Sequence, residues 1–293
     1  MIAATPMRFG AVFPHNEIGA DPGAVRAWAQ GVEDLGYHHI LAFDHVLGAG
    51  TTNRPGWRGY SSEHRFHEVF VLFGYLAGLT TTIELMTGVL VLPQRQTALV
   101  AKQAAEVDVL SGGRLRLGVG LGWNQVEYEA LGQPFSHRGA KLGEQVELLR
   151  ALWAQPTVSY TGRWDEVVDA GIEPRPTRGT IPVWFGGHVE ATLRRIGRIG
   201  DGWLPHIAPD STAGAMVERM RGYALDAGRD PGDIGLQPRL TLAATPADTR
   251  VEYVNRWRAL GATHFDIDAL GLGSSSVDQH LAVLEETIAA LAP

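Results

Sequence analysis

The chain has 293 residues, 45% hydrophobic and 19% charged, and its formal net charge of −7 argues against sequence-independent binding to nucleic acid, which requires a basic face. It contains no cysteine, which excludes disulfides, thiolate nucleophiles and cysteine-ligated metal centres. Because the N-terminus MIAATPMRFGAVFP lacks the features of a signal peptide, and no apolar run approaches the roughly 20 residues of a membrane span, we expect a cytoplasmic protein without membrane association.

Strands and amphipathic helices alternate along the first half of the chain. Strands are predicted at 7–13, 39–43, 83–92 and 114–119, and helices at 22–35, 69–79, 97–110 and 138–153. Asp21 is expected to cap the first helix, with Pro22 at the first helical position. Residues 48–68 are glycine- and serine-rich and too long for a plain connection, which is typical of a functional loop. Apolar strands alternating with helices indicate a parallel sheet.

Residues 157–178 interrupt this alternation, and we interpret them as an inserted hairpin with short strands at Val158-Ser159-Tyr160 and Val167-Val168. The alternation then resumes with strands at 182–185, 202–205, 234–242 and 264–267, and helices at 189–199, 213–227, 248–260 and 277–291. No linker separates two compositions, so residues 1–293 are predicted to form one domain. The count favours an α/β fold, a closed (β/α)8 TIM barrel with an insertion at about 157–178; the alternative is a doubly wound open sheet.

A glycine-rich turn, Gly118-Val119-Gly120-Leu121-Gly122, ends the strand at 114–119. Its spacing differs from the G-x-G-x-x-G of dinucleotide sites, and no acidic residue ends a strand about 20 residues later. Two interpretations remain: a turn that only reverses the chain, or a backbone surface free of side chains that a flat ligand can approach. Ligands in such folds lie at the carboxyl ends of strands, which favours the second interpretation.

A second glycine turn, Phe185-Gly186-Gly187-His188, lies between a predicted strand and helix. Glycines at a helix N-terminus expose backbone N–H groups to anions, and late strand–helix loops of barrels often bind phosphate. We therefore predict a phosphate site here, although similar glycines occur in structural turns. Arg194 and Arg195 of the next helix are expected to form a solvated face near enough to Gly187 to attract an anionic tail.

Asp44 and His45 end the second predicted strand, where the catalytic groups of barrels lie. A lone histidine is more often structural, but His45 can exchange a proton near neutral pH, and Asp44 could hold its ring or bind a ligand. His64 and His67 would need a third ligand and a helix to bind a metal. Their serine-rich surroundings favour a solvated loop, so no metal site is predicted.

Taken together, four motifs resemble those of the bacterial luciferase-like superfamily of flavin and deazaflavin enzymes. The motifs are Phe43-Asp44-His45, Thr87 to Pro93 (TGVLVLP), Ser111-Gly112-Gly113-Arg114 through Gly122-Trp123-Asn124, and Phe185-Gly186-Gly187 followed by Gly200-Asp201-Gly202-Trp203. Their order and spacing extend over almost the whole chain. The resemblance implies a barrel with an insertion, an oxidoreductase and a homodimer, and it is greatest for the branch that uses the deazaflavin coenzyme F420.

The resemblance also implies roles for individual residues. His45 would transfer a proton or polarise the coenzyme ring, and Thr87 and Gly88 would form a bulge behind the ring, often with a non-proline cis peptide. The residues expected near the ring and its ribityl chain are Asp44, Thr87, Gly88, Gly120, Gly122 and Asn124. The residues expected at the coenzyme phosphate are Gly186, Gly187 and His188.

The chain departs from this pattern at one position. Sugar-phosphate dehydrogenases of the branch carry a glutamate just after the glycine turn, where this chain has Trp123. A proton donor is missing there, so the sugar-phosphate reaction is not expected. The tryptophans expected to form an aromatic substrate pocket instead are Trp57, Trp123, Trp164 and Trp203. Both the 48–68 loop and the insertion are expected to shape this pocket.

The predicted function is hydride transfer between C5 of F420 and a small organic substrate, with the coenzyme supplying the redox chemistry. One alternative is an FMN-dependent monooxygenase of the same superfamily, supplied with reduced flavin by a partner. The other is a non-catalytic relative that only binds coenzyme. The sequence identifies neither the substrate nor the direction of transfer.

Overall fold

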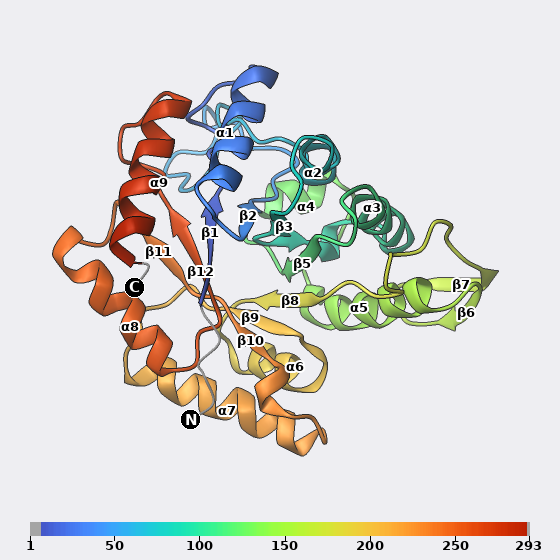
Figure 1. Cartoon of the computed structure of the whole chain (residues 1–293). Coiled ribbons are helices and arrows are strands. Elements are labelled where there is room, and N and C mark those ends of the chain that lie inside the picture. Colours follow the sequence, from blue (N-terminus) through green and yellow to red (C-terminus); the bar gives the residue numbers. More distant parts are fainter. Residues whose placement is uncertain (1–6, 292–293) are drawn as a thin grey trace.

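Parallel strands form the centre of the protein and helices cover their outside, in a computed structural model that describes residues 7–291 (Figure 1). The strands of the central sheet are β1 (Arg8–Val12), β2 (His39–Ala42), β3 (Glu84–Thr87), β4 (Leu90–Val91), β5 (Leu115–Gly120), β8 (Val183–Gly186), β9 (Gly202–Leu204), β10 (Gly235–Leu236), β11 (Arg239–Thr241) and β12 (His264–Asp268). Their order is β10-β9-β8-β5-β3-β2-β1-β12-β11, with β4 beside β5. The ends of the predicted domain, 1–6 and 292–293, lie outside the described residues.

The sheet closes through the segment 234–242, which was predicted as one strand and consists of β10 and β11. β10 pairs with β9 and β11 pairs with β12, both in parallel. Pro238 has no N–H to donate, so it interrupts the ladder between these two strands. Because β3–β4 and β10–β11 are each one interrupted strand, the ten strands occupy eight barrel positions. The predicted (β/α)8 barrel is confirmed, and the open doubly wound sheet is wrong.

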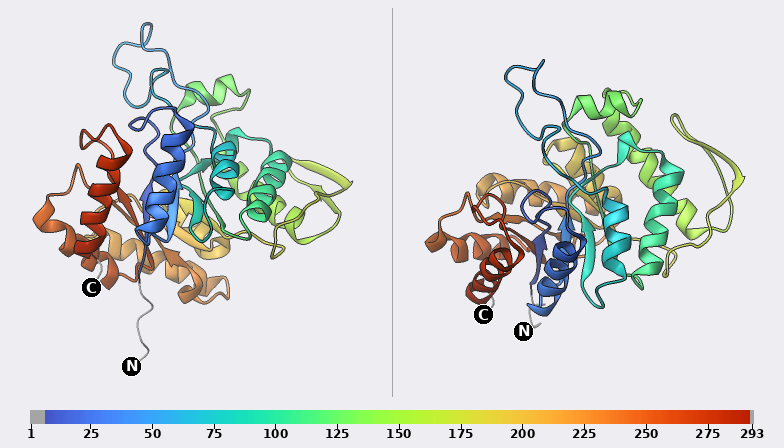
Figure 2. Two further views of the ribbon diagram at one scale, coloured as in Figure 1. Left: turned by 45° about the horizontal axis from the view of Figure 1, so that its top comes forward. Right: turned by 90° about the horizontal axis from the view of Figure 1, so that it is seen from above.

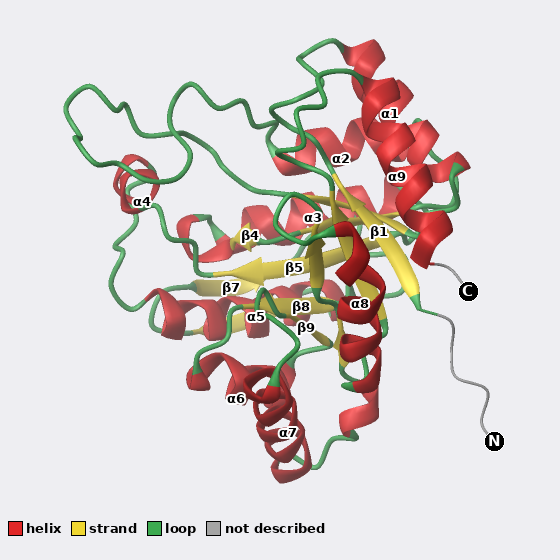
Figure 3. Ribbon diagram, turned by 90° about the vertical axis from the view of Figure 1, so that its left-hand side faces the viewer, coloured by secondary structure: helices red, strands yellow, loops and turns green. Residues whose placement is uncertain are grey.

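The helices follow the strands as expected and pack on the outside of the sheet (Figures 1 and 3). They are α1 (Pro22–Asp34), α2 (Val69–Ala77), α3 (Thr97–Leu110), α4 (Gln125–Ala130), α5 (Arg138–Ala154), α6 (Glu190–Ile199), α7 (Ser211–Asp226), α8 (Arg250–Ala259) and α9 (Val277–Leu291). The Asp21 side chain caps α1 by accepting a hydrogen bond from Gly23 N–H at 3.1 Å, as predicted. The short helix α4 was not predicted.

The insertion is the antiparallel hairpin of β6 (Val158–Thr161) and β7 (Glu166–Ala170), which confirms its predicted strands. Glu144 of α5 holds the turn of the hairpin, because its carboxylate accepts hydrogen bonds from the N–H groups of Arg163, Trp164 and Asp165. In Figure 1 the hairpin projects from the barrel beyond α5, at the far right of the view. It is therefore a separate layer and not part of the barrel wall.

The interior of the barrel is filled by side chains, which confines ligands to its ends. A buried polar network joins His39 to Asp266 at 2.8 Å, Asp266 to Gln237 at 2.7 Å, and Gln237 to Arg116 at 2.8 Å. Next to it lies a small apolar cluster of Met86, Trp184 and Leu204. Barrel enzymes place their sites at the carboxyl ends of the strands, so this is the end at which a ligand site is expected.

No helix within residues 7–291 is long and apolar enough to cross a bilayer.

Candidate functional site

A cavity of about 300 Å³ opens at the carboxyl ends of the strands. It is lined by Phe43, Asp44, His45, Tyr60, Gly88, Val89, Val91, Gly122, Trp123, Glu127, His206 and Arg239. Four of the predicted site residues, Asp44, His45, Gly88 and Gly122, are therefore brought together although they are far apart in sequence. Three others, Thr87, Gly120 and Asn124, are buried beside the cavity without lining it.

His45 is held at the cavity by a buried carboxylate. Its Nδ1 lies 3.3 Å from Oε2 of Glu127, and its ring contacts those of Tyr60, Phe66 and Trp123. An ionised carboxylate can only accept hydrogen bonds, so Nδ1 of His45 carries the proton and donates it. The other nitrogen, Nε2, is then left to exchange a proton with a molecule in the cavity.

Glu127 is one of the cavity residues that the sequence interpretation missed. Its carboxylate accepts hydrogen bonds from the backbone N–H groups of Val46 and Leu47 as well as from His45. It lies in α4, one helical turn after Trp123, the position at which a proton-donating group was judged to be absent. Asn124 caps this helix by accepting from Val126 N–H at 3.2 Å. An asparagine followed three residues later by glutamate is a helix-start pattern that would have placed Glu127 on a helix.

Asp44 does not hold the His45 ring. Its carboxylate accepts from Val91 N–H at 2.9 Å and pairs with the Arg95 guanidinium at 2.6 and 3.3 Å. Arg95 also pairs with Glu68 at 2.9 Å, so it joins the end of β2 to the start of α2. Asp44 is almost completely buried, and its hydrogen bonds hold the strand ends in place. Contact of Asp44 with a coenzyme stays a prediction.

The backbone bulges between β3 and β4, as the resemblance implied. A non-proline cis peptide joins Gly88 to Val89, and the Thr87 hydroxyl donates to Gly118 C=O at 2.6 Å on the neighbouring strand. A Cβ on Gly120 would lie 2.3 Å from Val89 Cγ2, and a Cβ on Gly186 would lie 2.8 Å from Val89 Cγ1. The absence of a Cβ at Gly120 and Gly186 therefore leaves room for the Val89 side chain. Contact of these two glycines with a ligand stays a prediction.

Gly186 ends β8, and Gly187 and His188 lie in the turn that leads to the start of α6; none of the three lines the cavity. Gly187 has a φ of +107°, which favours glycine, and its carbonyl accepts from Trp203 Nε1–H at 2.7 Å. The ladder of β8 with β9 ends at the pair Gly186 and Leu204, so the Gly187 N–H faces the Leu204 carbonyl, whereas within residues 7–291 the His188 N–H has no backbone or side-chain acceptor; both residues are exposed. The His188 N–H can therefore bind an anion from solvent at the positive end of the helix.

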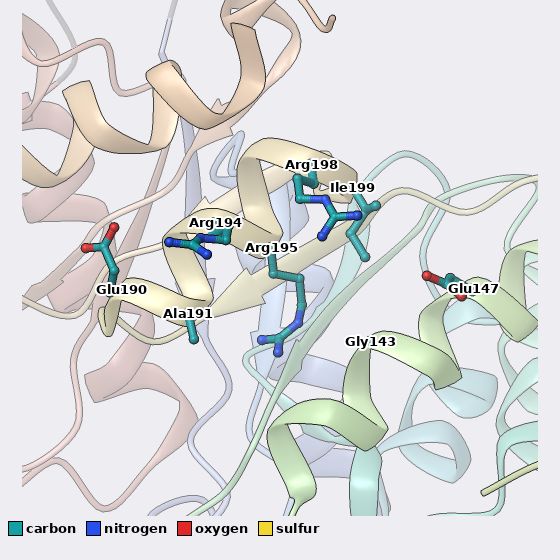
Figure 4. Close-up of a pocket in the computed structure, with 8 residues that line it drawn as sticks. All are labelled: Gly143, Glu147, Glu190, Ala191, Arg194, Arg195, Arg198 and Ile199. Carbon is teal, nitrogen blue, oxygen red and sulfur yellow. The ribbon is translucent and has the colours of Figure 1, made fainter. Parts of the chain in front are cut away.

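A groove of about 520 Å³ begins at the same helix start and runs between α5 and α6 (Figure 4). It is lined by Gly143, Glu147, Glu190, Ala191, Arg194, Arg195, Arg198 and Ile199. Figure 4 shows Arg195 and Arg198 extending from α6 toward α5. Glu190 is already engaged by the Tyr223 hydroxyl and by Arg219 at 3.5 Å, so the arginines dominate the charge that the groove offers to a ligand.

Two of the four tryptophans predicted to form the substrate pocket do not lie at the cavity. Trp57 and Trp123 lie with ring centroids 5.9 Å apart, and Trp123 lines the cavity. Trp203 is completely buried, with its indole N–H donated to Gly187, so it cannot contact a substrate. Trp164 lies in the hairpin insertion, under the Arg163 guanidinium. Counting tryptophans did not distinguish those in the core or the insertion from those at the strand ends.

The two segments expected to shape the pocket behave differently. The 48–68 loop extends over the carboxyl end of the barrel beside α4 (Figure 2, left) and contributes Tyr60 to the cavity. No residue of the insertion lines the cavity, so the expectation for that segment is wrong. Within residues 7–291 no cluster of three or more histidine, aspartate or glutamate side chains could hold a metal ion.

The fold and these strand ends define a barrel enzyme of the luciferase-like type. Residues 7–289 match the family described as luciferase-like monooxygenase, and the chain belongs to that family.

Curated relatives extend over part of the chain. An uncharacterised protein of Mycobacterium tuberculosis is 34% identical over 174 residues, which is 59% of this chain and 60% of that protein's length. A protein of Segniliparus rotundus, named F420-dependent glucose-6-phosphate dehydrogenase, is 31% identical over 258 residues, which is 84% of this chain and 69% of that protein.

Two solved structures share the whole fold. An F420-dependent secondary alcohol dehydrogenase in complex with an F420–acetone adduct has a TM-score of 0.80 at 17% identity, covering 98% of this chain and 99% of that one. A riboflavin lyase with modified FMN has a TM-score of 0.75 at 16% identity, covering 96% and 92%. The similar proteins thus include ones named or solved with each coenzyme.

Proposed function

We propose that the protein transfers a hydride between coenzyme F420 and a small organic substrate. The observation that carries the proposal is the arginine-lined groove between α5 and α6, which starts where the coenzyme phosphate is expected. F420 has an acidic tail beyond its phosphate, whereas FMN ends at its phosphate. A cationic groove that continues from the phosphate site is therefore useful for F420 and has no partner in FMN.

The phosphate would be held by the backbone of Gly187 and His188 at the start of α6. The His188 N–H has no acceptor within residues 7–291, and both residues are exposed, so an oxyanion from solvent can bind this N–H without displacing a protein contact. From there the tail would pass along Arg194 and Arg198, both exposed on α6.

The cavity at the strand ends would hold the ring of the coenzyme and the substrate together. When bound, the deazaflavin supplies the hydride chemistry at its C5. Glu127 fixes the ring orientation and tautomer of His45, whose Nε2 then gives a proton to the substrate or takes one from it. Trp123 and Tyr60 cover this position from the side of α4 and the 48–68 loop. Their rings exclude water from the proton-transfer site.

The first test is a parallel titration with F420 and FMN, followed by quenching of tryptophan fluorescence. Tight binding of F420 and weak binding of FMN supports the proposal and justifies a screen of hydride acceptors. A preference for FMN would contradict it and favour the monooxygenase alternative. Binding of F420 without turnover of any acceptor would favour the non-catalytic alternative.

Variants separate the phosphate from the tail. Gly187→Asp is expected to abolish binding of both coenzymes, because it places a carboxylate against the phosphate. Gly179→Asp is the matched control, since Gly179 also has a positive φ (+68°) and lies in open space away from α6. The double change of Arg194 and Arg198 to glutamate is expected to weaken F420 about tenfold or more and to leave FMN unchanged. If the double change weakens F420 and FMN equally, the groove does not bind the tail of F420.

A further inference from the structure

The polar side chains around the cavity fall into two groups. Asp44 and Glu127 are fully engaged by the protein, through Arg95 and Val91 N–H in one case and through His45 and two backbone N–H groups in the other. Arg239, His206 and Tyr60 also line the cavity, but their side chains have no hydrogen-bond partner within residues 7–291. The second group is therefore available to a ligand.

Arg239 differs from the other arginines that reach into the barrel. Arg95 pairs with Asp44 and Glu68, and Arg116 pairs with Glu84 at 2.7 Å. The Arg239 guanidinium instead lies over the face of the Phe43 ring, 4.7 Å from its centroid, and its Nε is buried without an acceptor. Arginine has five N–H donors and no acceptor, so the Arg239 guanidinium, which has no protein hydrogen-bond partner within residues 7–291, can donate to an anionic ligand in the cavity.

The nearest carboxylates are committed elsewhere. Asp268 accepts from Leu270 N–H at 3.1 Å and from the Thr241 hydroxyl at 3.4 Å, and it forms no ion pair with Arg239 within the described residues. Asp266 accepts from His39 and Gln237. Both carboxylates lie on β12, the strand beside Arg239, and within the described residues neither accepts a hydrogen bond from its guanidinium.

His206 and Tyr60 can add donors beside Arg239. Partial burial and then the nearby Arg239 lower the pKa of His206, so its imidazole is neutral at pH 7. Burial and then Asp268 raise the pKa of the Tyr60 hydroxyl, which keeps its proton. A neutral histidine and a protonated tyrosine can each donate one hydrogen bond without adding charge.

We infer that Arg239, with His206 and Tyr60, forms an anion subsite for the substrate, and that the substrate is an organic acid whose carboxylate lies against this guanidinium. A carboxylate fits because its two oxygens match the paired N–H groups of a guanidinium. The identification of this anion as the substrate rests on the proposed hydride transfer. The anion site itself does not depend on the coenzyme.

The test uses matched pairs of acids and amides, benzoate with benzamide and hexanoate with hexanamide. Each is titrated into the full chain while tryptophan fluorescence is followed, because Trp123 lines the same cavity. At least one acid is expected to bind about tenfold or more tightly than its amide. If neither pair shows a preference for the acid, the inference is wrong, and this measurement needs no variant.

Variants then assign the preference to one side chain. Arg239→Gln is expected to weaken binding of the acid about ten- to a hundredfold and to leave the amide within about twofold. Arg239→Lys, which keeps the charge but not the paired donors, is expected to retain part of the preference. Arg258→Gln on the exposed face of α8 is the matched control and is expected to change neither ligand. An acid preference that survives Arg239→Gln would overturn the assignment.

A coenzyme titration of the same variants separates this inference from the proposed function. If Arg239→Gln weakens F420 as much as it weakens the acid, Arg239 serves the coenzyme and the inference is wrong. If the acid binds as expected and neither coenzyme binds, the proposed function fails while the anion subsite is supported.

Discussion

His15 is a buried histidine whose neutral form stabilises the folded protein. Its side chain is 2% exposed and packs against Phe13 and Phe66, with ring centroids 4.8 and 5.1 Å away. Its Nδ1 accepts a hydrogen bond from His67 N–H at 3.3 Å, so a proton on that nitrogen would break the bond. Burial, followed by the nearby His67 and His45, lowers the pKa of His15 from 6.5 to about 3.

This shift makes the stability of the protein depend on pH. The unfolded chain takes up the His15 proton as pH falls below 6.5, whereas the folded protein does not until about pH 3. The stabilisation is therefore complete above pH 6.5 and is lost progressively as pH falls from 6.5 toward 3. Between pH 7.5 and 5.5 the loss in free energy of unfolding is about 1.3 kcal/mol. Because pH 5.5 is far above the folded pKa, the result is insensitive to its precise value.

Urea unfolding at pH 7.5 and 5.5 measures this pH-dependent change in the free energy of unfolding. His15→Asn keeps an acceptor for His67 N–H but cannot be protonated, so its stability should fall about 1.3 kcal/mol less than that of the wild type over this interval. The comparison is of the pH-dependent change, because the smaller side chain also lowers stability at both pH values. His188→Asn, at an exposed position, is the control and should behave as the wild type. Equal changes in wild type and His15→Asn would refute the reasoning.

Two further predictions concern the site and the assembly. Glu127→Gln should lower the free energy of unfolding by about 1.5–3 kcal/mol, because it removes a buried carboxylate that accepts from His45 and from backbone N–H groups. Glu129→Gln, on the exposed side of α4, is the control and should change this free energy little. Urea titration measures both. A homodimer, proposed from the resemblance, should sediment at twice the chain mass. Large apolar side chains are exposed on the adjacent helices α2 and α3, among them Val71, Leu99 and Leu110, and we expect the interface there. Leu99→Asp should therefore weaken the dimer, whereas Leu225→Asp on α7 should not. A monomeric wild type would contradict the dimer.

The barrel was predictable because apolar periodicity is a local property that survives folding. Each long buried strand and each one-sided helix left its pattern in the sequence, so the order of the predicted elements was correct, although the short helix α4 was missed and the segments 83–92 and 234–242 were each predicted as one strand. The interruptions inside strands were harder to locate. The break at Gly88-Val89 lies within an apolar run, and the contacts that define both this break and the one at Pro238 come from other strands. Pro238 alone was a local signal, since proline cannot donate to a ladder.

The candidate site was predictable only where it followed a strand end. Asp44, His45 and Gly122 were found because carboxyl ends of parallel strands converge, whereas Gly88 was expected only from the family resemblance. Glu127 was missed because α4 has six residues, too few to show which face is buried. Arg239 was missed for a different reason. A single charged residue in a predicted strand resembles an ordinary outward-facing position until the closure of the barrel shows that it faces inward.

The two halves of the barrel also divide the chemistry. In the first half, the polar groups at the strand ends are engaged with one another: Asp44 with Arg95, and Glu127 with His45. They hold one proton-transferring nitrogen in a fixed position. In the second half, the His188 N–H and the Arg239 guanidinium have no protein acceptor among the residues that the structure describes. Substitutions in the first half should therefore change stability and turnover, whereas substitutions in the second half should change the affinity for anionic ligands. The carboxylates Asp44 and Glu127 thus accept from protein donors, whereas the Arg239 guanidinium is available to a ligand.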